Sequence, residues 1–193
     1  MTRVIVFIDG SNFYHTCKNH LGTSDIEFRA FCDKLAENNT IVEIGYYTAP
    51  VSQQTFPERY QTQQKFFSRI RKIPHLKLIL GKLRPRNITC PRCRKIIPLC
   101  PECKRKIVSH VEKKTDVNFA VDMVALAFED KYDTGIIVTG DGDFTSAVKL
   151  AQKLNKKIII AHFARGYSSE LNQTCDSEII LDADYMEGCY LDY

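Results

Sequence analysis

The chain has 193 residues, a length that suits one domain with its own hydrophobic core and, at most, a small insertion. Apolar residues make up 44% and charged residues 26%, a balance that excludes both a disordered chain and a membrane-embedded one. Apolar runs such as Ile158–Ala161 are too short to cross a bilayer, and the N-terminal run ends at Asp9 with no small-residue cleavage site after it. We therefore expect a cytoplasmic protein with no membrane partner.

Basic residues are concentrated in one segment of the chain. Eleven Lys and Arg face two Glu between Gly81 and Lys114, a local charge of +9, whereas the rest of the chain carries −5. A basic segment on an acidic body is typical of a protein that binds a polyanion. A solvated insertion kept in solution by its lysines explains the charge equally well.

The first half of the chain alternates between strands and helices. Val4–Ile8 is an apolar, β-branched run, as expected of a strand buried on both faces of a parallel sheet. After it we expect, in chain order, a helix through Phe13 and Leu21, a helix over Ile26–Ala36, a strand over Ile41–Tyr47, a helix over Phe56–Ile73 and a strand over Leu76–Leu80.

The same alternation resumes after the basic segment. Val117–Phe128 is apolar throughout, which predicts a well-buried helix. The remaining elements are a strand over Gly135–Val138, a helix over Phe144–Leu154, a strand over Lys157–His162, a helix over Ser168–Cys175 and a strand over Glu178–Leu181. This order predicts an α/β fold of three layers, Rossmann-like, with a mainly parallel sheet and right-handed crossovers.

Two aspartates follow predicted strands directly. Asp9 ends the first strand, and Asp141 follows Gly135–Val138 by way of Thr139-Gly140. In open parallel sheets, ligands bind beyond the carboxyl ends of the strands, where the strand order reverses. Both side chains are therefore candidates for a functional site, although Asp-Gly is also a common turn pair.

Further carboxylates belong to the same candidate set. Asp122 lies in the apolar helix, where an unpaired buried charge is costly, so it should face a polar cleft or a cation. Asp143 follows Asp141 closely, and Asp116 stands near a helix start, where helix capping is an equal alternative. Clustered carboxylates repel one another unless a cation lies among them, and Mg²⁺ and Mn²⁺ prefer oxygen ligands. Asn12 and Ser11 would add neutral hydrogen bonds.

Several motifs resemble those of one family. The run Val4–Tyr14, the segment Glu112–Val117, the run Val121–Met123, the segment Thr139–Phe144 and the closing stretch Ser168–Asp182 are similar, in that order, to the NYN domain family. This family includes the LabA-like proteins and is a branch of the PIN-like ribonuclease superfamily. The resemblance covers nearly the whole chain outside the basic segment.

The resemblance implies a PIN-like sheet and a metal-dependent ribonuclease that hydrolyses RNA phosphodiesters with an activated water. By position, the acids that would hold Mg²⁺ or Mn²⁺ are Asp9, Asp122, Asp141 and Asp143. Asn12 would be a polar helper among the catalytic residues. Asp116 is secondary, because Lys114-Thr115 stands where the family often has a glycine and a hydrophobic residue.

Four cysteines within the basic segment have the spacing of a structural zinc site. Cys90 and Cys93 form one C-x-x-C pair, and Cys100 and Cys103 form the second, six residues later. Four thiolates leave no open position on the ion, so the expected role is structural. We therefore expect one NYN/PIN-like domain over residues 1–193 with a zinc-knuckle insertion over residues 82–110. The remaining cysteines are expected to be reduced thiols in or near the core.

The expected partner is RNA, most simply single-stranded. Phosphate contacts are expected from basic residues of the insertion: Arg84, Arg86, Arg92, Lys95, Lys104 and Arg105. Tyr14, Phe13 or Phe144 could stack on bases, although core packing is the more natural role of Phe144. The insertion could also hold a protein partner or a second copy of the chain.

Two other functional classes share features with this pattern. A non-catalytic RNA-binding or scaffolding module that retains the fold stays open, because intact acids do not exclude it. A phosphatase with an Asp nucleophile of the HAD type usually has a second Asp two residues later, where this chain has Ser11. A dinucleotide-binding dehydrogenase is excluded, because no G-x-G-x-x-G follows the first strand.

Overall fold

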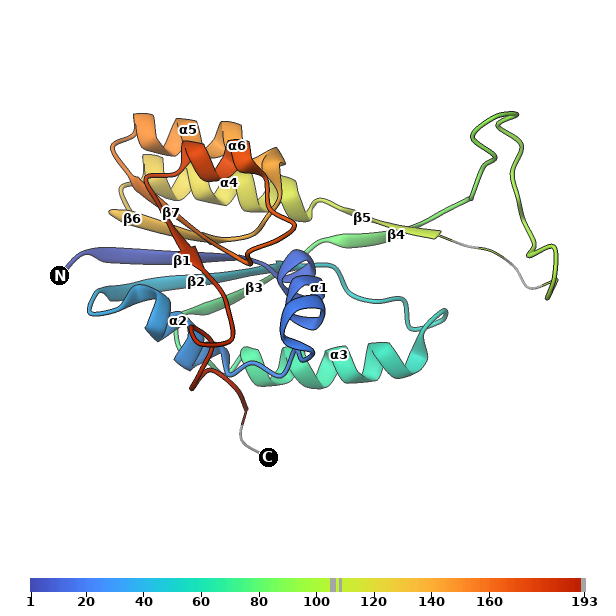
Figure 1. The fold of residues 1–193 in the computed structure, drawn as a ribbon, viewed down its shortest axis with the longest axis horizontal. Helices are drawn as coiled ribbons and strands as arrows, with labels where there is room; N and C mark the ends of the chain where they lie inside the picture. Colours follow the sequence, from blue (N-terminus) through green and yellow to red (C-terminus); the bar gives the residue numbers. More distant parts are fainter. Residues whose placement is uncertain (105–106, 108, 192–193) are drawn as a thin grey trace.

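The computed structural model describes residues 1–104, 107 and 109–191. Six parallel strands form one sheet in the order β3-β2-β1-β6-β7-β8 (Figure 1). The bounds of the strands are β1 Arg3–Asp9, β2 Thr40–Thr48, β3 Leu76–Leu80, β6 Thr134–Val138, β7 Lys157–His162 and β8 Ser177–Ile180. The strand order runs outward in opposite directions from β1 and β6, so the topological switch point lies between these two strands.

Helices cover both faces of the sheet. Their bounds are α1 Gly10–Leu21, α2 Phe28–Ala36, α3 Pro57–Ile70, α4 Thr115–Phe128, α5 Thr145–Lys153 and α6 Ser169–Thr174. Side chains of α1, α2 and α3 pack with one face of the strands, and side chains of α4, α5 and α6 pack with the other (Figure 1). The structure is therefore the expected three-layer α/β fold.

The central strands are buried, as their composition predicts. Successive side chains of β1 enter opposite cores: Val6 packs on the α1–α3 side and Phe7 on the α4–α6 side. Phe7 packs against Phe119 of α4, with 5.8 Å between the ring centroids. A strand that contributes to two cores at once must be apolar along its whole length, which explains the unbroken run in the sequence.

The burial of α4 differs from the prediction. Phe119 and Met123 are buried against the sheet, but Val117, Val121 and Phe128 are 64%, 57% and 79% exposed. A well-buried helix was therefore the wrong expectation. The helix packs on the sheet and on α5 with one side, and within the described residues no element covers the opposite side.

The basic segment contains a structural element that the sequence did not predict. β4 Lys82–Arg86 and β5 Ser109–Lys113 pair antiparallel as a two-stranded ribbon that projects from the body (Figure 1). The outgoing strand of this ribbon begins at Lys82, and its returning strand runs to Lys113. Gly81 is required at its base, because a Cβ there would lie 2.8 Å from the Lys113 carbonyl oxygen.

Candidate metal centre

The acidic pocket lies at the switch point of the sheet. It is lined by Asp9, Ser11, Asn12, His15, Thr16, Glu112, Asp116 and Asp141. Asp9 ends β1 and Asp141 follows β6, and these two strands are neighbours. The expectation that both aspartates lie at one edge of the sheet is therefore consistent with the structure.

Asp9 is held rigidly below the pocket surface. Its side chain caps α1 by accepting a hydrogen bond from the Asn12 backbone N–H (3.1 Å), and it accepts a second one from Thr139 Oγ1 (3.1 Å). The residue is 6% exposed. Burial raises the pKa of the Asp9 carboxyl from 3.8 to about 6, and the charges of Asp116 and Glu112 add to the effect.

Thr139 joins the two acidic turns. While its hydroxyl donates to Asp9, its Oγ1 accepts a hydrogen bond from the Asp141 backbone N–H (3.1 Å). Asp141 in turn caps the short 3-10 helix Gly142–Phe144 through the backbone N–H of Asp143 (3.0 Å). Each aspartate therefore stabilises a turn, as the turn interpretation predicts, and also lines the pocket.

Asn12 connects α1 to the turn after β6. Its Oδ1 accepts a hydrogen bond from the Gly140 backbone N–H at 3.1 Å. Gly140 has no room for a side chain, because a Cβ would lie 2.6 Å from the Gly166 carbonyl oxygen. This close approach holds the Asp141 turn against the loop that follows β7.

Glu112 and Asp116 complete the acidic lining from the other side. Glu112, on β5, accepts a hydrogen bond from Ser11 Oγ (2.7 Å) at its Oε2, while its Oε1 is buried without a hydrogen-bond partner in the described structure. Asp116 lies in the first turn of α4 and is not its N-cap. Burial, followed by the charges of Glu112, Asp141 and Asp143, raises the pKa of the Asp116 carboxyl.

The structure separates Asp122 from this group. Its Oδ2 accepts a hydrogen bond from Tyr47 Oη (3.1 Å), and it does not line the acidic pocket. Asp122 lies six positions after Asp116 on α4, which corresponds to about 9 Å along the helix and to a different side of it. The expectation that Asp122 lies in the acidic pocket is therefore corrected: in the structure Asp122 is a hydrogen-bond partner of Tyr47. Asp143 is exposed beside the pocket and is not among its lining residues.

Glu112 and Thr139 were missed by the sequence analysis as site residues. In the sequence Glu112 is a charge of the basic segment and the first residue of the motif Glu112–Val117, and neither pattern shows that it lines a pocket with Asp116. The role of Thr139 depends on β1 and β6 being adjacent, a pairing between residues 130 positions apart. Phe13 and Phe144 are buried and unavailable for base stacking, whereas Tyr14 is 42% exposed.

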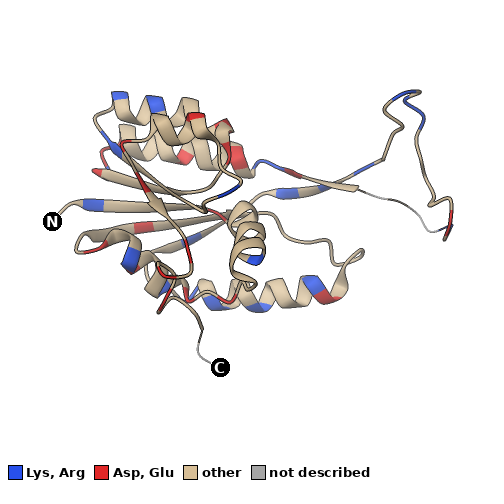
Figure 2. Cartoon of the chain, viewed as in Figure 1, with Lys and Arg blue, Asp and Glu red and all other residues tan. Residues whose placement is uncertain are grey.

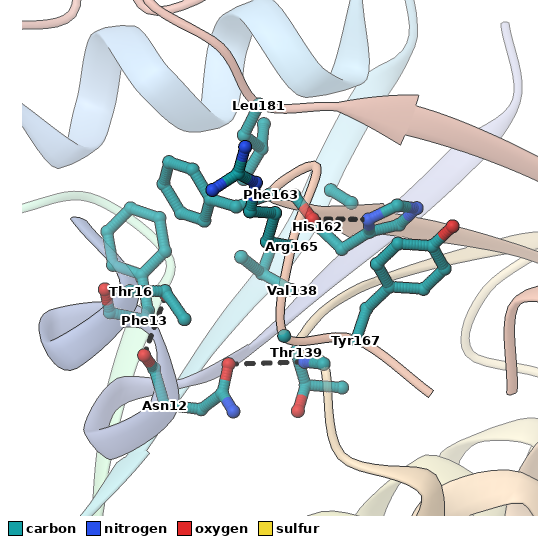
Figure 3. A pocket seen from close by; sticks show the side chains of 13 residues that line it. Asn12, Phe13, Thr16, Val138, Thr139, His162, Phe163, Arg165, Tyr167 and Leu181 are labelled. Carbon is teal, nitrogen blue, oxygen red and sulfur yellow. Dashed lines mark hydrogen bonds between the residues drawn. The ribbon is translucent and has the colours of Figure 1, made fainter. Parts of the chain in front are cut away.

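A second, smaller cavity adjoins the acidic pocket and shares Asn12 and Thr16 with it (Figure 3). Its opposite wall is the loop after β7, with Arg165 and Tyr167. Tyr167 stacks on His162 at 4.0 Å between ring centroids, and the His162 ring is held by Glu178 (3.2 Å). An exposed arginine and a stacked aromatic ring thus line the cavity that adjoins the acidic pocket.

The tip of the insertion contains two turns of the same form. In each, the backbone N–H of the residue after the second cysteine bonds to the carbonyl of the first: Arg94 to Cys90 (2.8 Å) and Lys104 to Cys100 (3.0 Å). Arg94 and Lys104 both have left-handed backbones, with φ of 57° and 56°. Backbone N–H donors lower the pKa of the Cys90 and Cys100 thiols. Each turn therefore favours a thiolate.

Neither candidate metal site is a closed cage. Within residues 1–104, 107 and 109–191, no three His, Cys, Asp or Glu side chains converge closely enough to hold one ion. Of the predicted phosphate-binding residues, Arg84, Arg86, Arg92, Lys95 and Lys104 are exposed on the ribbon and its tip, and Arg105 lies outside the described residues. No helix of the described chain is both long and apolar enough to span a membrane.

Three comparisons with known proteins bear on the family. The NYN domain model matches residues 3–182. An uncharacterized protein of Methanocaldococcus jannaschii, MJ0482, is 34% identical over 70 residues, which span 36% of this chain and 29% of that protein. The crystal structure of VPA0982, a protein of unknown function from Vibrio parahaemolyticus, superposes with a TM-score of 0.69 at 21% identity, over 98% of this chain and 96% of that one.

The solved structure shows that the same fold exists over the whole length, and the family model covers all the elements that build the acidic pocket. NYN domains are in general ribonuclease-like. The chain belongs to the NYN domain family.

Proposed function

We propose that this chain is a metal-dependent ribonuclease that hydrolyses phosphodiester bonds of RNA. The observation that carries the proposal is the acidic pocket at the switch point, where Asp9, Asp116, Asp141 and Glu112 line one open space. Burial, and after it the charges of neighbouring carboxylates, raises the pKa of both Asp9 and Asp116, as is common for carboxyls in functional pockets.

The residues of the pocket suit a hard divalent cation. All the charged donors are carboxylates, and Glu112 Oε1 is buried without a partner in the described structure. An open set of carboxylates suits Mg²⁺ or Mn²⁺, because these ions keep several waters and take few protein ligands. Asp9, Asp116 and Asp141, with Asp143 beside them, would hold such a cation partly through its own waters, and the cation would supply an activated water and stabilise the leaving oxygen.

The neighbouring residues position these acids. Thr139 fixes one oxygen of Asp9, and Asn12 ties the Asp141 turn to α1 through Gly140. Ser11 orients Glu112. The reacting carboxylates are thus attached to strand ends and a helix start, which are rigid parts of the fold.

We also propose a structural Zn²⁺ in the insertion. Each of the two cysteine turns lowers the pKa of its first thiol, and thiolates are ligands that Zn²⁺ prefers. The insertion also has few apolar side chains with which to build a core. The four ligands would be Cys90, Cys93, Cys100 and Cys103.

A cleavage assay tests the enzymatic proposal. A labelled single-stranded RNA is incubated with Mn²⁺, with Mg²⁺ or with no divalent ion, using the wild type, Asp9→Asn, Asp141→Asn and the control Asp184→Asn. Asp184 is exposed and is not among the residues that line the pocket. Cleavage that needs the metal and is lost only in the two pocket variants supports the proposal. A wild type that binds several RNAs but cleaves none would favour a non-catalytic binding module.

A further inference from the structure

The β4–β5 ribbon has two chemically different faces. In the antiparallel register Leu83 lies opposite Glu112, and Arg84 lies opposite Val111. Paired residues project from the same face, and successive residues of a strand project from opposite faces. The ribbon therefore separates its side chains into an inner face and an outer face.

The inner face is turned toward the body of the protein. It carries Leu83, Pro85, His110 and Glu112. Glu112 reaches Ser11 at the start of α1, and the His110 ring lies 5.9 Å from that of Phe56, just before α3. This face supplies one wall of the acidic pocket.

The outer face is basic and free. It carries Lys82, Arg84, Arg86 and Lys113, together with Ser109 and Val111, and no acidic residue. All four cations are exposed, and in the part of the chain that the structure describes none of them forms an ion pair. Figure 2 shows the blue residues following the ribbon away from the body.

We propose that the outer face of the ribbon binds the flank of a single-stranded RNA. The RNA then crosses the edge of the ribbon and places its scissile phosphodiester in the acidic pocket. This proposal rests on the proposed ribonuclease function. The four cations of that face set the affinity for this flank. Glu112, on the inner face, repels any phosphate whose charge is not neutralised by a bound cation. Only the scissile phosphodiester of the RNA therefore enters the pocket.

The dimensions of the ribbon support an RNA strand as the occupant. From Lys82 to Arg86 is four strand steps, about 13 Å at about 3.3 Å per residue. In a strand with stacked bases a phosphate recurs about every 3.4 Å along the strand axis, so this length corresponds to the axial rise of about four nucleotides. A ribbon only two strands wide, with strands about 4.8 Å apart, can be crossed by a flexible single strand. A stiff duplex cannot turn across so narrow an edge.

The test compares RNAs of two lengths. Steady-state cleavage of a 3-nucleotide and a 20-nucleotide RNA is measured for the wild type, for Arg84→Glu/Arg86→Glu and for the control Lys72→Glu/Lys157→Glu. The control makes the same charge change at exposed lysines near the amino ends of β3 and β7, the sheet edge opposite the pocket. We expect the ribbon variant to raise KM for the long RNA at least tenfold, with kcat and the KM of the short RNA unchanged. Equal changes for both lengths, or none, would overturn the proposal.

Binding without cleavage separates this proposal from the proposed activity. Anisotropy of the labelled 20-nucleotide RNA is measured without added Mg²⁺ or Mn²⁺, over a range of salt concentrations. Removing the cation that neutralises one phosphate should reduce the slope of log K against log salt by about 0.7, so the ribbon variant, which removes two, should show a slope smaller by about 1.4. If the wild type cleaves no RNA but shows the steeper salt dependence, the result supports the docking surface and refutes only the proposed nuclease activity. An unchanged slope and affinity refute the docking surface even if cleavage is observed.

Discussion

Replacing Asp9 with Asn should stabilise the metal-free protein at neutral pH, because it removes a buried charge. Burial raises the pKa of the Asp9 carboxyl from 3.8 to about 6. A carboxyl whose pKa is raised in the folded state destabilises the fold when it is charged. This loss of unfolding free energy is absent below pH 3.8, grows up to about pH 6 and is complete above it. The difference amounts to about 3 kcal/mol of unfolding free energy at pH 7.5.

The asparagine recovers most but not all of this energy. Its Oδ1 can still accept from the Asn12 backbone N–H, but its amide must then face Thr139 Oγ1, which already accepts from Asp141. A weakened hydrogen bond costs about 1 kcal/mol, which leaves a net gain of about 2 kcal/mol. For a chain of this size the gain corresponds to about 5 °C in Tm.

Thermal unfolding of the wild type and of Asp9→Asn in metal-free buffer measures this difference. At pH 7.5 the variant should melt higher; at pH 4.5 the wild-type penalty falls to about 1 kcal/mol and the two should melt together. Adding Mg²⁺ should raise the Tm of the wild type more than that of the variant, because the variant lacks one of the carboxylates that would hold the ion. A variant that melts below the wild type at pH 7.5 without metal would refute the reasoning.

Three further outcomes follow from single contacts. Gly140→Ala places a methyl 2.6 Å from the Gly166 carbonyl oxygen, so urea unfolding should show a loss of about 2 kcal/mol, and unchanged stability would contradict the close approach. Asn12→Ala leaves the Gly140 N–H without its acceptor, and we expect Mn²⁺-dependent cleavage to fall more than tenfold with Tm lowered by only a few degrees; an equal rate would exclude Asn12 from positioning the site. Elemental analysis of the purified chain should find about one zinc per chain, lost in Cys93→Ser, and a zinc-free wild type would contradict the knuckle.

The sheet and half of the site were predictable from local sequence. The apolar, β-branched run Val4–Ile8 is typical of a strand buried on both faces, and an acid directly after such a strand must lie at its carboxyl end. The same argument gave Asp141. These inferences depend on residues that are adjacent in the chain, which is why they agree with the structure.

The remaining parts depend on contacts between distant segments. Basic residues alternate with Leu83 and Pro85 in the segment Lys82–Arg86, a pattern that resembles a solvated loop. Its strand conformation depends on pairing with β5, and the same pairing brings Glu112 to Ser11. Asp122 was expected in the pocket because burying an unpaired charge is costly. In the structure its carboxylate instead accepts a hydrogen bond from Tyr47, 75 residues away in the chain. The exposed side of α4 could not be predicted because apolar composition does not show which neighbours a helix has.

Whether the acidic pocket itself holds the divalent cation is tested most directly by Mn²⁺ binding, measured by electron paramagnetic resonance at pH 7.5 with the wild type, Asp141→Asn and the control Asp184→Asn. Asp141 lines the pocket and the Asp184 side chain does not. We expect the wild type and the control to bind Mn²⁺ with the same affinity and Asp141→Asn to bind at least tenfold more weakly. Equal binding by all three, or none by the wild type, would contradict a metal centre at this site.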